Sequence, residues 1–420
     1  MRHTSAFVLF RASLMSMLVL LASAAWAVEG SEAGTLYTFA ELWQNAAASL
    51  PQLAAAAAGR GIARGESIQA ALRPNPALEI ASENLGSGQR EETVSVSQAI
   101  ELGGKRAARM SLAARVSTLA EYEVAAKRAA VYAELKQAFV ATLAAQSRYT
   151  LAVSSHDLAQ RSALSIDRQI EAARLAKLAG TRVQVDVANA NLGIVRAKSE
   201  LARARMKLAV ASGTPLRNIV ADGALESLPE LAPLAELEAR LESAPLVLVA
   251  RYETARRQAE VDVESSRRTG DLTLNAGVRH LSGSDEAVGV LSIAIPLPLT
   301  DRNQGSVLRA QSAAEQAASG ERATYLTLQS ELHDTYLKYA TAVATVATVR
   351  DDIVPTAAAA LADTERGFSL GKFGLADVLE TRRILVQARL QLVDACTEVH
   401  LAEVALTRIF GPTDPGPSGP

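Results

Sequence analysis

Two stretches of the sequence repeat apolar and small residues with a period of seven, which restricts them to long helices packed closely side by side. In the stretch 180–211 these residues are Val187, Ile194, Leu201 and Leu208, each followed three residues later by Ala190, Ala197, Ala204 and Ala211. In the second they are Val378, Leu385, Leu392, Val399 and Leu406, followed by Thr381, Ala388, Ala395, Ala402 and Ile409. Such positions form the a and d seam of a coiled coil, and a strict seven-residue repeat imposes left-handed supercoiling. The sequence therefore predicts closely packed, supercoiled helices.

The N-terminus reads as a secretory signal peptide, residues 1–27. Arg2 and Arg11 precede the apolar run 14–21, and Ala25-Trp26-Ala27 supplies a small-x-small cleavage pattern. The alternative is a retained membrane anchor, but the run is shorter than the roughly 20 apolar residues that a spanning helix needs. No later run approaches that length without charge. The mature chain is therefore expected to be either soluble or a membrane β-barrel protein.

Several functional classes find no support in the composition. The net charge of −2 and the pI of about 6.3 give no basic field for nucleic acid. The single cysteine, Cys396, provides neither a disulfide framework nor a lipid attachment site at the cleavage point, and it is expected to be a small packed side chain. The histidines lack ligand spacing, and no phosphate loop, nucleophile motif or paired-carboxylate site is present. We expect no enzyme, no cofactor, no metal site and no catalytic residue.

An internal duplication organises the rest of the chain. Pro51 lies 194 residues before Pro245, and the same offset carries Leu78 and Ile80 onto Leu272 and Leu274. The first repeat, 28–227, is expected to contain a helix (about 39–72), a β-hairpin (about 77–102), a long helix (about 105–176), a tip turn (about 177–183), a heptad helix (about 184–212) and a linker. The second, 228–411, is expected to contain a helix (about 234–267), a β-hairpin (about 271–299), a long helix (about 304–370), a tip turn (about 371–376) and a heptad helix (about 377–410).

Pro355 should kink or locally open the second long helix. Residues 412–420 should form a flexible tail.

The two hairpins constrain the assembly. Four strands cannot close a transmembrane barrel, whose smallest form has about 8, and open strand edges are intolerable in lipid. The economical solution is a cyclic oligomer in which three chains share one barrel of about 12 strands. The expected fold class is therefore mainly α with a small β part, internally duplicated, with a trimeric α-barrel and a shared transmembrane β-barrel. A soluble protein carrying two hairpins is the alternative.

The sequence resembles the TolC superfamily of outer-membrane efflux ducts, and within it the CzcC-type subfamily that serves heavy-metal exporters. The residues that carry this resemblance are Asn75-Pro76-x-Leu78, Glu83-Asn84, Gln98, Glu101-Leu102-Gly103-Gly104-Lys105-Arg106, and the two Gly-x5-Asp-Val segments that start at Gly180 and Gly371. The resemblance covers essentially the whole mature chain. It implies a homotrimer in outer-membrane lipid whose periplasmic helices dock onto a periplasmic adaptor (a membrane fusion protein) and an inner-membrane pump of the resistance-nodulation-division (RND) class.

The resemblance also implies roles for residues near the two tip turns. Gly180, Thr181, Gly371 and Lys372 would lie at the turns where the adaptor docks. Asp377 and Glu380, just past the second turn, would ring the narrow periplasmic entrance. Helix geometry agrees, because both lie about 110 degrees from the a/d seam and can face a lumen while the seam packs. A threefold ring of these carboxylates would attract cations, and its crowding should raise some carboxyl pKa values. The alternative is a solvated helix face.

Asp186 and Asn189 hold the corresponding places in the first repeat. The resemblance implies that the aspartate is tied to a tyrosine and an arginine of the other turn, which hold the entrance shut. Phe368 and Phe373 stand at those two positions here, and neither can donate a hydrogen bond. The adjacent Lys372 could take over the closing contact, in which case neutralising it should raise conductance.

These observations predict a passive outer-membrane duct of a tripartite efflux system in a Gram-negative bacterium, with heavy-metal cations as the favoured cargo. The cargo follows from the resemblance alone. A duct for drugs or for type I protein secretion is the nearest alternative. Proteins of another class, a periplasmic adaptor or a soluble coiled-coil scaffold, fit the duplicated hairpins less well.

Overall fold

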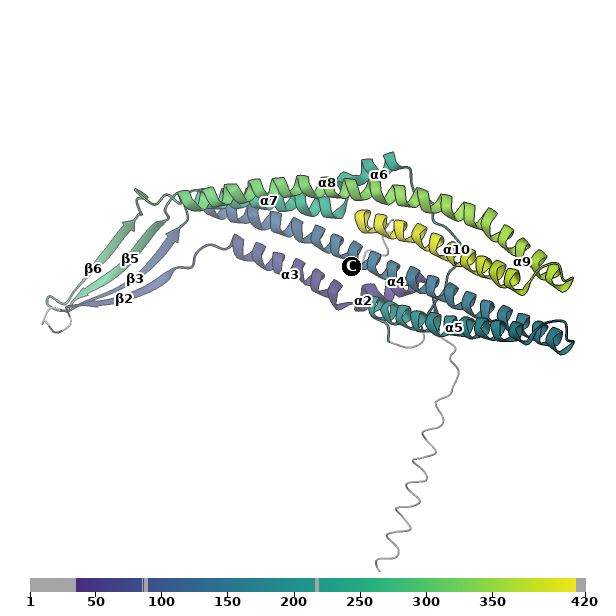
Figure 1. The fold of residues 1–420 in the computed structure, drawn as a ribbon. Helices are drawn as coiled ribbons and strands as arrows, with labels where there is room; N and C mark the ends of the chain where they lie inside the picture. The colour runs from purple at the N-terminus through teal and green to yellow at the C-terminus, as the bar shows by residue number, and fades with distance from the viewer. Residues whose placement is uncertain (1–34, 85, 87–89, 216–218, 413–420) are drawn as a thin grey trace, which may run out of the picture.

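The chain folds into an elongated molecule with a small β-sheet at one end and two helical turns at the other (Figure 1). The computed structural model describes residues 35–84, 86, 90–215 and 219–412. The expected signal peptide, 1–27, and residues 413–420 of the expected tail lie outside the described residues. None of the helices in the described ranges is long and apolar enough to cross a membrane.

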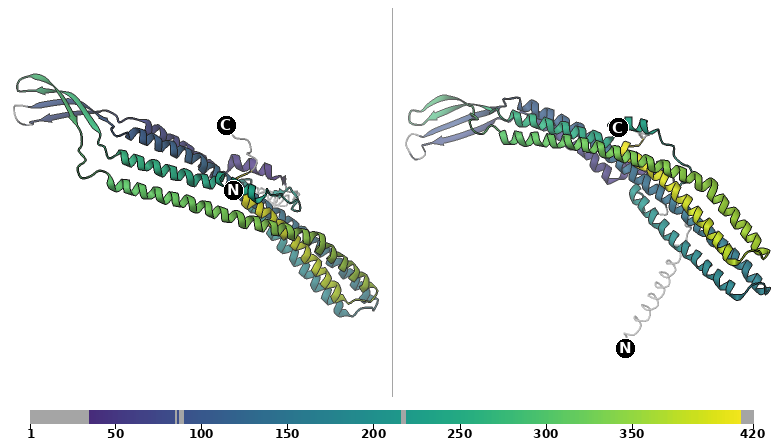
Figure 2. Two further views of the ribbon diagram at one scale, coloured as in Figure 1. Left: turned by 90° about the horizontal axis from the view of Figure 1, so that it is seen from above. Right: turned by 45° about the horizontal axis from the view of Figure 1, so that its top comes forward.

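The same order of elements occurs twice along the chain, as the duplication predicts. The first run is α2 (Phe39–Ser49), α3 (Pro51–Ala71), β2 (Ala77–Glu83), β3 (Glu91–Ile100), α4 (Lys105–Glu171) and α5 (Lys177–Ser212). The second run is α6 (Leu234–Arg240), η1 (Leu241–Ser243), α7 (Pro245–Ser266), β5 (Leu272–Leu281), β6 (Glu286–Ala294), α8 (Gln304–Thr348), η2 (Val349–Ile353), α9 (Val354–Ser369) and α10 (Leu375–Phe410). The paired helices α4–α5 and α9–α10 curve together toward the end opposite the sheet (Figure 2).

The heptad prediction is confirmed in both helices. None of the a and d side chains is exposed, and those of Leu208 and Val399 are fully buried. Alanine at d allows α5 to lie close against α4, and α10 packs against α4, α8 and α9. The largest buried cluster lies midway along the molecule, where α2 adds Leu42 and Trp43.

The four longer strands form one antiparallel sheet in the order β2-β3-β5-β6. Leu78 pairs with Val96, and Ile80 with Val94, so these side chains share one face. The pairing Val94 to Val278 continues that face onto β5. Its exposed large apolar side chains are Leu78, Ile80, Val94, Val96, Val278, Leu291 and Ile293. Glu79, Glu91 and Arg279 alternate with them and lie on the opposite face. Within the described residues, β2 and β6 each have one free edge.

A short parallel strand pair was not predicted from the sequence. β1 (Thr35–Tyr37) pairs with β4 (Ile219–Ala221), which joins the start of the first run of elements to the segment that follows α5. Gln146 on α4 holds this pair through both backbone groups of Ala221, at 3.0 and 3.1 Å. Three-residue strands carry too little alternation to be recognised.

Two helices that were each predicted as continuous are broken. The expected helix 39–72 divides at Leu50, and the expected helix 234–267 divides at Ala244, each just before a proline. Proline is restrictive for the residue before it and favourable at the first helical position, so Pro51 and Pro245 begin new helices. The second expected hairpin, 271–299, is also shorter, because β6 ends at Ala294.

The predicted opening near Pro355 is present. Residues Val349–Ile353 form a π-helical turn immediately before α9, in which Pro355 lies within the first turn. Proline has no backbone N–H to continue the preceding α-helical ladder, and the wider π turn accommodates the missing bond.

Candidate functional site

The first tip turn does not lie where the sequence placed it. α4 ends at Glu171 and α5 begins at Lys177, so the turn comprises Ala172–Ala176 rather than 177–183. Ala173 takes a left-handed conformation, with φ of 56°, and makes the reversal without a glycine. Gly180 and Thr181 therefore lie in the first turns of α5. A Cβ atom on Gly180 would meet Ile170 Cδ1 at 3.1 Å, so this glycine allows α4 and α5 to approach closely.

The second tip turn comprises Leu370–Gly374, close to the predicted 371–376. Gly371 has a φ of 71°, a left-handed conformation that glycine adopts without strain. The N–H of Lys372 donates to the carbonyl of Gly367 at 2.8 Å and closes the end of α9. Lys372 itself is exposed.

Asp377 stands at the start of α10 and caps it. Its carboxylate accepts a hydrogen bond from the backbone N–H of Gly374 at 2.8 Å. A carboxylate in the first turn also interacts favourably with the partial positive charge of the helix N-terminus. The position is thus fixed by the backbone, with the second carboxylate oxygen left for other interactions.

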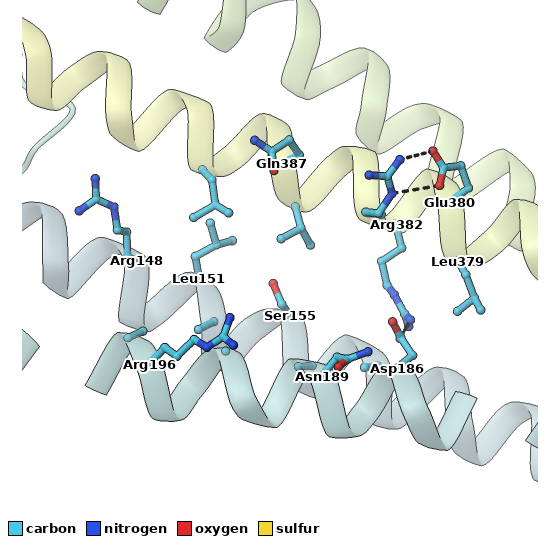
Figure 3. A pocket seen from close by; sticks show the side chains of 18 of the residues that line it. Arg148, Leu151, Ser155, Asp186, Asn189, Arg196, Leu379, Glu380, Arg382 and Gln387 are labelled. Carbon is cyan, nitrogen blue, oxygen red and sulfur yellow. Dashed lines mark hydrogen bonds and ion pairs between the residues drawn. The ribbon is translucent and has the colours of Figure 1, made fainter. Parts of the chain in front are cut away.

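Three of the predicted residues are brought together one turn further on. Asp186, Asn189 and Glu380 line a cavity of about 740 Å³ between α5 and α10, with α4 forming its floor (Figure 3). Asp377 does not line it. The apolar part of the lining comes from small and branched residues such as Leu151 and Ala190.

Arginines occupy much of this cavity and were missed by the sequence analysis. The charged lining residues are Arg148, Arg196, Arg382 and Arg383, together with Asp186, Glu200 and Glu380. One chain therefore contributes one more positive than negative charge to the groove. The sequence did hold a signal, because Arg382 follows the d residue Thr381 and so occupies an e position, from which charged side chains reach a neighbouring helix.

Glu380 is neutralised within its own helix. Arg383, three residues later, donates to the two oxygens of Glu380 at 2.7 and 3.0 Å. These hydrogen bonds lower the pKa of the Glu380 carboxyl below its ordinary value. Crowding was expected to raise carboxyl pKa values here; within a single chain the pairing with Arg383 acts in the opposite direction.

Asp186 pairs with an arginine, but not with one of the tip turn. Arg382 on α10 reaches across to α5 and forms an ion pair with the Asp186 carboxylate. The Arg382 side chain is 5% exposed, and its burial lowers the pKa of the guanidinium from the ordinary value. A guanidinium is charged at any physiological pH even so, and it must be paired when it is buried.

The residues considered for the closing contact have other surroundings. Phe368 packs with Ile166 and Val183 in the apolar cluster between the two helix pairs. Phe373 is half exposed and lies against Gly367, where a Cβ atom would meet its ring. Lys372 forms no ion pair with any residue in the described part of the chain.

No cluster of three or more His, Cys, Asp or Glu side chains that could hold a metal ion occurs among the residues that the structure describes. The groove can therefore be described by its charge pairs and its shape. Ion pairs link the helices that form its walls, and its lining carries side chains of both charges.

Comparison with known proteins agrees with this architecture. Residues 237–412 match the family model described as outer membrane efflux protein. The cobalt-zinc-cadmium resistance protein CzcC of Cupriavidus metallidurans is 34% identical over 367 residues, which cover 87% of this chain and 88% of that protein. The nickel-cobalt-cadmium resistance protein NccC of Alcaligenes xylosoxydans xylosoxydans is 28% identical over 295 residues, covering 69% of this chain and 66% of that protein. The crystal structure of CusC shares the fold, with a TM-score of 0.76 at 16% identity, covering 89% of this chain and 92% of that one.

Proposed function

Because the chain belongs to the outer membrane efflux protein family, we propose that it is the outer-membrane duct of a tripartite system that exports heavy-metal cations. The observation that carries the proposal is the division of the molecule into an open sheet with one apolar face and, at the opposite end, a pair of helical hairpins. The metal cargo is supported by the names of the relatives, which are resistance proteins for cobalt, zinc, cadmium and nickel.

The free edges of the sheet support a trimer. β2 and β6 each leave one edge unpaired among the described residues, while large apolar side chains cover one face. In lipid those edges need partners, and strands from two further copies would supply them. Three copies would then share one barrel of about 12 strands, with the helices below forming a continuous tube.

The two tip turns are the proposed docking site for a periplasmic adaptor and, through it, an inner-membrane RND pump. Thr181, Gly371 and Lys372 are exposed there, and so are the apolar side chains of Leu178 and Leu370. Exposed apolar residues at the end of a helical hairpin favour contact with another protein. Gly180 contributes to this surface indirectly, by setting the distance between α4 and α5.

Asp377, Glu380, Asp186 and Asn189 are the proposed lumen residues of the periplasmic entrance. The three carboxylates are expected to attract cations unequally, because Arg383 offsets the charge of Glu380 and Arg382 offsets that of Asp186. Asp377 has no cationic partner in the described part of the chain and is expected to supply most of the attraction for cations.

Deletion of the gene, followed by growth on a panel of metals and organic drugs, tests the cargo. Loss of tolerance to zinc, cobalt, cadmium or nickel, restored by the wild-type gene, supports the proposal. Unchanged metal tolerance with lost drug tolerance would identify a drug duct instead.

The lumen assignment is tested separately, by the reversal potential of single channels in a planar bilayer. Asp377→Asn, which can keep the cap, should reduce cation preference more than Glu380→Gln. Asp334→Asn on α8 is the matched control, because Asp334 is exposed and its partner Lys338 is on the same helix. Equal selectivity in all three variants and the wild type would exclude Asp377 and Glu380 from the lumen.

A further inference from the structure

The apolar face of the sheet continues past the end of β6. The strand ends at Ala294, but apolar residues still occupy every second position of the connector to α8. Proline at 296 and 298 keeps the residues before them extended. The apolar residues of this connector, each more than half exposed, are Ile295, Leu297 and Leu299. The connector therefore carries the apolar surface of the sheet toward the helices (Figure 1).

The connector that precedes β2, at the other edge of the sheet, has a similar composition. Leu72 is 52% exposed, Pro74 and Pro76 follow it, and the apolar alternation resumes in the strand at Leu78 and Ile80. β2 has 7 residues, whereas a tilted strand needs about 9–11 residues to cross the hydrocarbon core. In a bilayer the missing length has to come from the connector.

The backbone of these connectors has few unpaired donors. Both prolines of each connector lack an N–H, and the N–H of Leu299 donates to the carbonyl of Leu297 at 2.9 Å. Gln98 is a polar residue within the apolar face, and its amide donates to the carbonyls of Pro74 at 2.9 Å and Ala99 at 2.8 Å. Polar groups in lipid need such partners within the protein. The connectors are therefore suited to the boundary of a bilayer.

Aromatic residues commonly mark the boundary between lipid tails and headgroups in a membrane barrel. The two hairpins and their connectors, 72–102 and 267–303, contain no Phe, Tyr or Trp. The boundary on the helix side must therefore be formed by other side chains. Arginine is suitable, because its aliphatic stem packs on apolar surface while its guanidinium binds phosphate.

Two arginines lie beside the apolar connector of β6. Arg302 follows it, and its guanidinium donates to the carbonyl of Leu299 at 3.4 Å. Arg268 belongs to the connector between α7 and β5, which packs against the first connector, because a Cβ atom on Gly270 would clash with the ring of Pro296. Both arginines are exposed, and neither forms an ion pair with a residue in the described part of the chain.

The nearby carboxylates already have partners in the protein. Asp271 pairs with Lys105 at 2.6 Å, and Glu264 pairs with Arg267 at 2.7 Å. Asp301 accepts a hydrogen bond from a backbone N–H two residues later, at 2.9 Å. The negative charges of this region are thus engaged, while two guanidinium groups are left for an external anion.

We propose that Leu297, Leu299, Arg268 and Arg302 form an anchor for anionic phospholipid. The leucines enter the boundary of the acyl chains, and the two arginines bind headgroup phosphates of the leaflet on the helix side. The inference rests on the proposed duct function and adds to it a partner, a lipid surface of negative charge. Three copies would repeat the anchor around the barrel.

Depth in the bilayer is tested with the full-length mature protein in phosphatidylcholine vesicles that carry a nitroxide quencher near the headgroup. In a Cys396→Ala background, Leu297→Cys and Leu299→Cys are each labelled with a small fluorophore. Both should be quenched severalfold more than Lys338→Cys on α8, whose side chain is 68% exposed. Quenching no stronger than at Lys338→Cys would overturn the proposal. A label at Leu291→Cys within β6 that bilayer quenchers at any depth leave unaffected would instead count against the barrel, and so against the duct function.

Headgroup preference is tested in mixed vesicles of phosphatidylcholine and phosphatidylglycerol, by the fraction of each spin-labelled lipid that the protein immobilises. The wild type should prefer phosphatidylglycerol severalfold at low salt, and added salt should weaken this preference. Arg268→Gln combined with Arg302→Gln should bring the two lipids to near equality. Arg309→Gln is the matched control, because Arg309 is exposed and lies about two turns further along α8. It should keep the wild-type preference.

Inorganic phosphate distinguishes a lipid site from a site for a free anion. The preference for phosphatidylglycerol should be the same in phosphate and chloride buffers of equal ionic strength, and its loss in phosphate would overturn the lipid assignment. Heat-modifiable mobility on gels checks that the variants assemble. In assembled protein, equal binding of both lipids by the wild type, or an unchanged preference in the double variant, would also overturn the proposal.

Discussion

The joint between the sheet and the helices offers a test in which two adjacent glycines separate two physical effects. The segment Glu101-Leu102-Gly103-Gly104-Lys105-Arg106 connects β3 to α4. Gly103 and Gly104 have similar left-handed conformations, with φ of 70° and 75°. A Cβ atom on Gly103 would lie 2.7 Å from Thr269 Cβ and 2.9 Å from the carbonyl oxygen of Ser266, whereas one on Gly104 would meet nothing within 4 Å.

The expected magnitudes follow from these distances. Alanine in the left-handed region costs about 1–2 kcal/mol, and this cost applies to both positions. At Gly103 the overpacking against Thr269 and Ser266 adds about 1–3 kcal/mol. Gly103→Ala should therefore destabilise the folded protein by about 2–5 kcal/mol, and Gly104→Ala by about 1–2 kcal/mol.

Thermal unfolding of the purified protein in detergent, followed by far-ultraviolet circular dichroism, measures the difference. The heating rate must be held constant, because unfolding of such proteins is often irreversible and the midpoint then depends on the rate. Thr269→Gly removes two of the three close contacts and should recover part of the loss in Gly103→Ala but none of it in Gly104→Ala. Equal midpoints for the two alanine variants would refute the packing argument.

Two further predictions concern buried side chains. Leu332→Ala on α8 should lower the free energy of unfolding by about 2–5 kcal/mol, because Leu332 is 0% exposed and packs with Leu237, Leu241 and Leu328; chemical denaturation would measure this, and a loss no larger than that of the exposed Lys338→Ala would contradict it. Burial, and to a lesser degree Glu226, raises the pKa of the Cys396 thiol, while Arg350 lowers it. At a given pH the folded chain thus holds less thiolate than free cysteine, so alkylation should be slow and its rate should continue to rise above the ordinary cysteine pKa. Denaturant should restore the ordinary rate, and equal rates in the folded and denatured chain would exclude the burial.

The heptad helices show how far a local pattern can be trusted. Each a and d position of α5 and α10 is at least partly buried, as the period predicts, because the period of side chains on a helix is fixed by the backbone. The hairpins were found for the same reason, since alternation in a strand is equally local. Breaks within the helices were missed at Leu50 and Ala244, although each precedes a visible proline.

The first tip turn shows where a local signal misleads. Gly180 suggested a reversal, but the chain turns at Ala172–Ala176 through a left-handed alanine. The glycine is explained by Ile170 of the neighbouring helix, at 3.1 Å from where its Cβ atom would lie. A glycine that allows a neighbouring helix to approach closely cannot be distinguished, from the sequence alone, from a glycine at a chain reversal.

The sequence alone was sufficient for the order of elements, the seams of the supercoiled helices and the positions of the acidic residues near the tip, because each of these depends on residues close together along the chain. The partners of those acidic residues depended on the tertiary structure. Asp186 and Arg382 are 196 residues apart, and they meet only because α5 and α10 pack on α4 with a particular rotation about their axes. That rotation results from the packing of the whole assembly of helices. The e position of Arg382 indicates that its side chain reaches a neighbouring helix, but it does not indicate which side chain it meets there.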